Sequence, residues 1–396
     1  MPINKPQALR TRLIHNHPDN DPYGSPYCPV YNTTTYRQAN TRALLDTIEG
    51  RADGPLYTRW GSNPTIEALE QSLAMLEQAP AALAFASGMA AISATLLCHG
   101  HEGIVGVGDL YGGTLEFLEH NARPLGYPVE YRRYDQLGEL GDTLRPGMLV
   151  YCETPANPTL RLIDIAALAE QVHHKGALLM VDNTFATPIN QQPLTLGADL
   201  VVHSASKYLG GHSDITAGAL MGDRERVRRV ASWRTNLGQI LSPETAALLA
   251  RSLRTLPLRV RTHNDNALAL AQALETMSPI RRVLYPGLAS FAQHELAKRQ
   301  MCGFGGMLSI ELEGDFEQAA AVADRLKVFV LAPSLGGLES LVSQPCATSH
   351  HGISREQRMA LGISDSLLRL SVGVESVEDL ISDIQQALDA AYDSAR

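Results

Sequence analysis

A lysine near the middle of the chain stands where an amine could form an imine. Lys207 follows the apolar run DLVVHS and lies between Ser204 and Ser206 in the segment HSASKYLGGHSD. A lysine at the end of a buried strand has its amine pKa lowered by desolvation, which is what imine chemistry requires. Taken alone, Lys207 fits a surface loop better, so this interpretation depends on two further segments.

These two segments add a phosphate site and an acid. In ASGMAAI, Ser87, Gly88 and Met89 lie between a strand and a helix, where free backbone N–H groups and the helix dipole hold a phosphate. The segment VDNTF ends another predicted strand with Asp182. A Schiff-base lysine, a phosphate cradle and a strand-end acid for a ring nitrogen are the parts that hold pyridoxal 5'-phosphate. The sequence therefore predicts this cofactor.

The elements that must position these residues alternate in type from residue 82 onward. The predicted strands of this part are AALAF, GIVGVG, PVEYRR, MLVYCE, ALLMVD, DLVVHS and AGALMG. Helical segments lie between them, for example over residues 88–97 and 164–174. The alternation predicts an α/β fold whose mostly parallel sheet is covered on both faces. Ligands bind such sheets at the carboxyl ends of the strands.

Changes in pattern divide the chain into three predicted parts. Residues 1–60, rich in Pro, Asn and Thr, predict an extended N-terminal arm. Residues 61–255 contain the alternating strands and helices and predict a large cofactor-binding domain. Residues 256–396 begin with a long helical pattern and continue with strands such as MLSIELE and LLRLSVG. They predict a linking helix and a smaller α+β C-terminal domain.

Composition argues against several partners. Lys and Arg number 33 against 42 Asp and Glu, so the net charge is −9, and without a basic block a nucleic-acid partner is not expected. Five cysteines without a C-x-x-C pair, and two histidines, His203 and His212, without ligand spacing, predict no disulfide framework and no metal site. A reducing, cytoplasmic location is expected, since the N-terminus also lacks a signal-peptide core.

One uncharged stretch needs testing as a membrane span. Residues 79–98 carry no charge and approach the ~20 residues that cross a bilayer. Pro80 stands at the start of the stretch, and Ser87 and Gly88 interrupt it. A short buried strand, a turn and the beginning of a helix are therefore expected there, and no membrane partner.

Eight motifs follow one another in a characteristic order: YTR, SGM, DLYGGT, ETPANP, VDNTFATP, SASKYLGGHSD, SLGGLESL and RLSVGVE. Together they resemble the Cys/Met-metabolism family of pyridoxal-phosphate-dependent enzymes of fold type I. That family contains cystathionine γ-synthases, cystathionine and methionine γ-lyases, and homoserine-ester sulfhydrylases. The resemblance runs from about Tyr57 to the end of the chain and implies a transferase-like fold and an enzyme.

The resemblance assigns a role to each residue at the cofactor. Lys207 forms the Schiff base and shuttles protons, Asp182 pairs with the pyridinium nitrogen, and Tyr111 stacks on the ring, which makes Lys207 and Tyr111 the expected catalytic residues. The implied phosphate ligands are Gly88, Met89, Ser204 and Ser206. Tyr57 and Arg59 match a pair that reaches the phosphate of the neighbouring subunit. A homo-oligomer is therefore expected, at least a dimer, with a homotetramer built as a dimer of dimers.

The resemblance also assigns residues to the substrate. Arg369 in RLSVGVE matches the residue that grips the α-carboxylate, a bidentate task suited to guanidinium geometry. The alternative is an arginine in a structural salt bridge. Asn157 in ETPANP and Ser334 in SLGG match residues beside the cofactor and the lysine. Either one fits a turn residue as well.

The sequence departs from the family pattern at three places. YTRWGSNPT has one extra residue before Asn63, which leaves the entrance loop open to question. Gly113 stands where methionine γ-lyases carry a reactive cysteine, which disfavours methionine as substrate. Glu116 stands where enzymes that handle cystathionine typically carry an arginine for a distal carboxylate, while Glu339 keeps the acid aimed at a distal ammonium. If both acids face the pocket, burying them is costly unless the substrate brings a cation. The alternative is that Glu116 faces solvent.

We expect a γ-lyase that acts on a small-molecule substrate, an amino acid whose γ-heteroatom carries a cationic far end, with canavanine as the example. The alternatives within the family are cystathionine γ-lyase or γ-synthase activity, or γ-replacement by a homoserine-ester sulfhydrylase. A non-catalytic binding protein is disfavoured, because Lys207 and Asp182 are both present. An aminotransferase would share the fold and the cofactor but would not need the SASKYLGGHSD and SLGGLESL motifs together.

Overall fold

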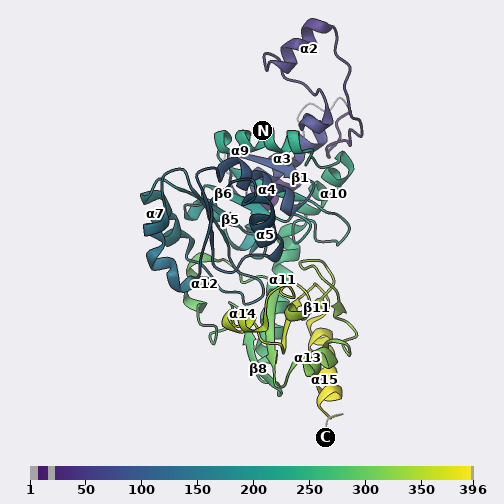
Figure 1. Cartoon of the computed structure of the whole chain (residues 1–396). Coiled ribbons are helices and arrows are strands. Elements are labelled where there is room, and N and C mark those ends of the chain that lie inside the picture. The colour runs from purple at the N-terminus through teal and green to yellow at the C-terminus, as the bar shows by residue number, and fades with distance from the viewer. Residues whose placement is uncertain (1–7, 17–22, 394–396) are drawn as a thin grey trace.

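The computed structural model describes residues 8–16 and 23–393 and contains a large sheet of seven strands (Figure 1). In spatial order the strands are β1 (Ala81–Phe85), β7 (Gly218–Gly222), β6 (Leu200–His203), β5 (Leu178–Asp182), β4 (Leu149–Glu153), β2 (Ile104–Val107) and β3 (Val129–Arg132). Strand β7 is antiparallel to its neighbours β1 and β6, and the remaining pairings are parallel. The predicted α/β fold with a mostly parallel sheet is confirmed.

Helices cover both faces of this sheet, as expected. One face carries α4 (Gly88–His99), α5 (Gly112–Phe117) and α9 (Arg224–Leu237), and the other carries α3 (Pro64–Leu76), α6 (Leu140–Thr143), α7 (Ile165–His174) and α10 (Pro243–Leu253). Alternate residues of one strand enter different cores: Tyr151 packs with α4, whereas Cys152 packs with α7. Because both faces are buried, the strands are apolar on both sides.

The uncharged stretch of residues 79–98 has the structure expected for it. It forms β1 and then α4, and the Ser87 hydroxyl caps the helix by accepting from the Ala90 N–H at 3.1 Å. Among the described residues no helix has the length and the apolar character needed to cross a bilayer.

A second sheet of five strands lies toward the C-terminus (Figure 1). Its spatial order is β10 (Val330–Leu331), β11 (Leu341–Ser343), β12 (Leu367–Ser371), β9 (Met307–Leu312) and β8 (Ile280–Leu284). Helices α13 (Phe316–Ala323) and α15 (Val377–Asp393) pack against it. Helix α11 (Leu256–Leu274) joins the two sheets, since Val260 belongs to a core of the first sheet and Leu270 to the core of the second.

Residues 1–60, predicted as an extended arm, contain two α-helices in their described part. These are α1 (Leu9–Ile14) and α2 (Thr41–Ile48), while residues 1–7 and 17–22 of the predicted arm lie outside the described residues. Helix α2 lies apart from the rest of the chain (Figure 1) and buries none of its residues. Leu44, Leu45 and Ile48 of this helix are exposed.

Shorter elements complete the described chain. They are α8 (Thr187–Asn190), α12 (His294–Gln300), α14 (Arg355–Ala360), η1 (Thr58–Trp60), η2 (Leu118–Ala122), η3 (Tyr134–Glu139), η4 (Pro193–Leu196) and η5 (Pro345–Ala347).

Candidate active site

A cavity of about 1030 Å³ opens where strands of the first sheet end. Its lining comes from both parts of the chain: Asp182 ends β5 and Lys207 follows β6, whereas Arg369 belongs to β12 of the second sheet. The cavity also brings together the predicted residues Gly88, Met89, Tyr111, Asn157, Ser204, Ser206, Ser334 and Glu339. Most of the residues singled out from the sequence therefore share one site.

Lys207 lies in this cavity, where its Nζ donates to Ser334 Oγ at 2.8 Å. Burial lowers the pKa of the lysine amine, and the nearby Arg369 guanidinium lowers it further. A larger fraction of the amine is therefore neutral near neutral pH than in an exposed lysine. Ser334 has a positive φ of 107°, an unfavourable conformation for a residue with a Cβ. Such backbone strain is commonly found at functional sites.

The phosphate-type loop forms a tight contact between α4 and the segment after β6. Gly88 is the first residue of α4, and a Cβ added there would lie 2.8 Å from the Cβ and 2.9 Å from the Cα of Ser204. Only glycine allows this approach, which sets the N-terminus of α4 against the Ser204 backbone. The N-terminus of a twelve-residue helix thus faces the cavity together with Ser204 and Ser206.

Two carboxyl groups lie on the sheet side of the cavity. Asp182 Oδ1 accepts the Thr184 N–H at 2.9 Å, and Glu153 Oε1 accepts the Tyr151 hydroxyl at 3.0 Å. Burial raises the pKa of Asp182 and raises that of Glu153 to about 8. A cation bound beside Asp182 would offset the free-energy cost of keeping a charged carboxylate in this buried position.

Tyr111 immediately precedes α5 at the edge of the cavity, with 48% of its surface exposed. Its N–H donates to Glu153 Oε1 at 2.8 Å, so the strand-end acid fixes the backbone that carries the ring. A Cβ at Gly113 would lie 2.6 Å from the Tyr111 ring. A cysteine at position 113 would therefore require this ring to move.

Three predicted substrate residues form one cluster around Arg369, whose side chain is buried. Its Nη1 donates to Asn157 Oδ1 at 3.1 Å and its Nη2 to the Ser334 carbonyl at 2.9 Å. The Nε is buried without a hydrogen-bond partner among the described residues, and burial lowers the guanidinium pKa to about 10. No ion pair of Arg369 occurs within the described residues, which disfavours the structural salt bridge.

The two acids predicted for the far end of the substrate are not brought together. Glu339 lines the cavity and accepts a hydrogen bond from Ser213. Glu116 of α5 is exposed and does not belong to the described lining, so it agrees here with the alternative of a solvent-facing residue. The structure thus places one carboxylate, not two, in this part of the cavity.

Tyr57 and Arg59 also lie outside the lining formed by their own chain. The Arg59 Nη1 donates to the Thr235 carbonyl at 2.9 Å, and its guanidinium lies 5.9 Å from the Tyr57 ring centroid. The longer YTRWGSNPT segment forms the turn η1, continues through Gly61 at φ 86° and ends where the Asn63 side chain caps α3. The extra length is accommodated by a left-handed glycine.

Comparison with known proteins decides what kind of site this is. The sequence profile of the "Cys/Met metabolism PLP-dependent enzyme" family matches residues 10–389. The chain belongs to this family. It is 42% identical to an L-methionine gamma-lyase of Pseudomonas putida over 98% of its own length and 99% of the relative's. It is 39% identical to a cystathionine gamma-lyase of Dictyostelium discoideum, covering 96% and 97% of the two chains.

Solved structures of the family have the same fold. A cystathionine gamma synthase from Xanthomonas oryzae pv. oryzae, in complex with aminoacrylate and cysteine, superposes with a TM-score of 0.91 at 37% identity, covering 98% of this chain and 100% of that one. The chain is thus an enzyme that depends on pyridoxal phosphate. Its cavity fits that group, since it combines a helix N-terminus, a buried acid and a lysine with a lowered pKa.

Two residues of the site were missed by sequence reasoning. Glu153 and Tyr151 lie in MLVYCE, whose pattern predicts a strand and nothing more. The available signal was their spacing of two residues, which puts both side chains on the same face of the strand, close to its carboxyl end. Their contact with Asp182 depends on which strand lies beside β4, and the motif itself does not contain that information.

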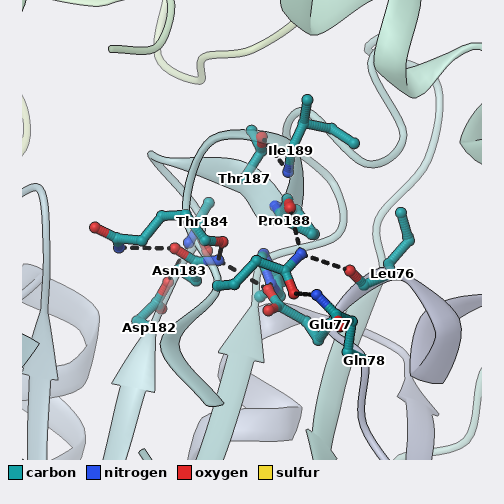
Figure 2. Close-up of polar contacts among 12 residues, drawn as sticks. Leu76, Glu77, Gln78, Asp182, Asn183, Thr184, Thr187, Pro188 and Ile189 are labelled. Carbon is teal, nitrogen blue, oxygen red and sulfur yellow. Dashed lines mark hydrogen bonds and ion pairs between the residues drawn. The ribbon is translucent and has the colours of Figure 1, made fainter. Parts of the chain in front are cut away.

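The two histidines on either side of Lys207 make hydrogen bonds within the chain. His203 is buried, and its Nε2 lies 2.6 Å from Glu77 Oε1. Asn183 donates to the same oxygen at 2.8 Å, and Figure 2 shows Asn183 beside Glu77. Because Val202 pairs with Asp182, His203 and Asn183 point to the face of the sheet opposite the acid pair. His212 contacts the Gly210 carbonyl at 2.7 Å.

Gly88→Ala should weaken binding of pyridoxal phosphate to the apoprotein by about tenfold or more. The added methyl group would push α4 away from Ser204, and overpacking of this kind costs about 1–3 kcal/mol. Gly138→Ala is the control, because no heavy atom lies within 4 Å of a Cβ at that position. Absorbance titration of the apoproteins measures both affinities, and equal affinities would exclude a tight cradle at Gly88.

Proposed function

We propose that this enzyme catalyses γ-elimination on an amino acid whose γ-heteroatom carries a cationic far end, such as canavanine. The observation that carries the proposal is the charge of the cavity around Glu339. Among the described lining residues the lysine and arginine side chains are Lys207 and Arg369, and both have tasks near the reacting carbon. The far end of the substrate therefore meets a carboxylate and no cation of this chain.

The geometry of the cavity supports one set of cofactor ligands. We assign the phosphate to the N-terminus of α4 and the nearby hydroxyl groups, contributed by Gly88, Met89, Ser204 and Ser206. Asp182, which lines the cavity, would hold the ring nitrogen in its protonated form, and Tyr111 at the cavity edge would stack on the ring. When bound, pyridoxal phosphate supplies the electron sink that the elimination needs.

Lys207 is the proton carrier in this proposal. Its Nζ takes the Cα proton of the substrate, a task for which the lowered amine pKa suits it. The hydrogen bond to Ser334 Oγ holds the amine on one side of the cavity. The same amine stays in the cavity and can also take part in the Cβ proton transfer that precedes departure of the γ leaving group.

Arg369 orients the substrate by its α-carboxylate. Its two Nη atoms donate to Asn157 and to the Ser334 carbonyl, which fixes the orientation of the guanidinium group. The buried Nε–H has no partner among the described residues and is available to a substrate carboxylate. A charge-assisted, bidentate hydrogen bond fixes the direction as well as the position of the carboxylate. The Cα–H bond is then presented to Lys207 in one orientation.

A second candidate is cystathionine chemistry, either γ-lyase or γ-synthase, and γ-replacement on a homoserine ester belongs with it. Glu339 favours it, because the distal ammonium of cystathionine would also pair with this carboxylate. The distal carboxylate of cystathionine, however, finds no free arginine or lysine among the described lining residues. A substrate panel scored for 2-oxobutanoate, homoserine and ammonia separates elimination from replacement.

Glu339→Gln is expected to lower kcat/KM for canavanine by roughly ten- to hundredfold. A hydrogen bond to a charged group contributes about 1.5–3 kcal/mol, and the amide removes the charge but keeps the size. The value for a neutral homoserine ester should change little. Glu116→Gln is the matched control and should stay within about twofold of the wild type, since Glu116 is exposed. Equal losses on both substrates would exclude a pairing of Glu339 with a cationic far end of the substrate. A wild-type preference for cystathionine would favour the second candidate.

The enzyme is further proposed to be a cytoplasmic homo-oligomer, a dimer at least and a tetramer as a dimer of dimers. The apolar residues exposed on α2 support it, because an isolated helix with an apolar face is covered in a stable assembly. Tyr57 and Arg59 support it as well. They lie on the surface of their own chain, outside its cavity lining, where a second copy can reach them.

A further inference from the structure

Glu153 and Asp182 are direct partners in the sheet. They end the adjacent parallel strands β4 and β5 and are paired in register, so their side chains point to the same face. Both line the cofactor cavity, and Glu153 is only 8% exposed. Two carboxyl groups thus stand side by side where water is scarce.

One tyrosine hydroxyl lies between the two acids. Tyr151 is fully buried, and its hydroxyl is 3.0 Å from Glu153 Oε1 and 3.5 Å from Asp182 Oδ2. The hydroxyl has one proton to donate, and the shorter contact makes Glu153 the acceptor of its hydrogen bond. Glu153 Oε1 therefore accepts twice, from Tyr151 and from the Tyr111 N–H, whereas its Oε2 is free to carry a proton.

Two carboxyl groups that are paired in register and contact the same buried hydroxyl are not both ionised. Burial and the charge of Asp182 raise the pKa of Glu153 to about 8, and Asp109 adds in the same direction. The negative charge is better placed on Asp182, since it is less buried than Glu153 and accepts the Thr184 N–H, which stabilises the charged form. The basic groups that line the same cavity are Lys207 and Arg369.

We propose that Glu153 is a positioning residue that works as a neutral carboxylic acid. Its Oε1 anchors the backbone of Tyr111, and its proton leaves Asp182 as the single anion for the cofactor ring nitrogen. The inference rests on the role of Asp182 proposed above. Loss of the Glu153 proton at higher pH adds a second negative charge beside Asp182 and changes the electrostatics of the ring.

Infrared spectroscopy of the apoprotein tests the protonation state without the cofactor. The wild type should have the C=O stretch of a buried carboxylic acid at about pH 7, and this band should fade as the pH rises through about 8. Glu153→Gln should remove the band at every pH. Asp182→Asn should keep the band but make it fade at a lower pH than in the wild type, because the charge that helps to raise the Glu153 pKa is gone. A band that Asp182→Asn removes and Glu153→Gln keeps would overturn the assignment of the proton, as would a spectrum without the band.

Affinity for pyridoxal phosphate tests the positioning role. Glu153→Gln keeps an oxygen acceptor for the Tyr111 N–H and should bind the cofactor within about twofold of the wild type near pH 7. The affinity of the wild type should change as the pH rises through about 8, and the affinity of Glu153→Gln should not. Glu153→Ala removes the acceptor and should bind about tenfold more weakly. Glu130→Gln, at a half-buried residue of β3 that pairs with Arg132 and does not line the cavity, is the control. If glutamine weakens binding as much as alanine does, a charged Glu153 is required and the proposal fails.

Discussion

Replacing Lys207 by alanine is expected to lower turnover by at least about four orders of magnitude. Lys207 is the only lysine among the described residues that line the cavity, so no second amine can take its place. Loss of a group that both binds and moves protons removes a whole catalytic step rather than one contact. A steady-state assay measures the loss, and the visible absorbance of the bound cofactor should change with it. Turnover close to the wild type would exclude Lys207 as the base.

Two controls make this result specific. Lys298→Ala, which alters a lysine that pairs with Glu295 on the surface, should keep wild-type activity. Mixed subunits of Lys207→Ala and Arg59→Ala should regain part of the activity, because a mixed dimer then has one site without either change. No recovery in subunits that demonstrably exchange would contradict a site shared between two copies.

Replacing Arg369 by lysine is the second large effect. Lysine keeps the positive charge but not the planar fork, so the contacts to Asn157 and to the Ser334 carbonyl are lost together with the bidentate grip. Disrupting a buried, hydrogen-bonded charge pair costs about 2–5 kcal/mol, which corresponds to roughly thirty- to several-thousandfold in kcat/KM.

The readouts for Arg369→Lys separate recognition from folding. The cofactor absorbance and the melting temperature of the loaded enzyme should change little, while kcat/KM falls. Arg282→Lys, at an exposed arginine that pairs with Glu311 away from the cavity, is the matched control and should leave all three quantities nearly unchanged. If Arg369→Lys weakens cofactor binding by the same factor by which it lowers kcat/KM, Arg369 has a structural role and not one in substrate recognition.

Features carried by a single strand and the turn after it were predictable from the sequence. Asp182 ends β5, Lys207 follows β6 and Gly88 begins α4, as expected from apolar runs followed by polar residues. Each of these expectations needs only local periodicity. The α/β fold follows from the same signal, repeated along the chain.

Features that depend on pairing between distant segments were not predictable. Glu153 acts beside Asp182 only because β4 and β5 are neighbours, and the order of strands is not written in either segment. The place of Glu116 near Tyr111 suggests the cavity, but the turn of α5 leaves this side chain exposed. Strand β8 was missed, because Arg281 and Arg282 interrupt its apolar pattern.

The path of the chain through α11 has a consequence for how new specificities can be made. Lys207 and Asp182 precede this helix, whereas Ser334, Glu339 and Arg369 follow it. Most of the reactive residues and most of the substrate residues are therefore encoded on different sides of α11, and the contacts of Asn157 with Arg369 and of Ser334 with Lys207 join the two sides. Recombination within α11 between two relatives would exchange Glu339 and Arg369 in one event and keep Lys207 and Asp182, provided that both relatives have Asn157 and Ser334. A single crossover thus achieves what would otherwise take several coordinated point mutations.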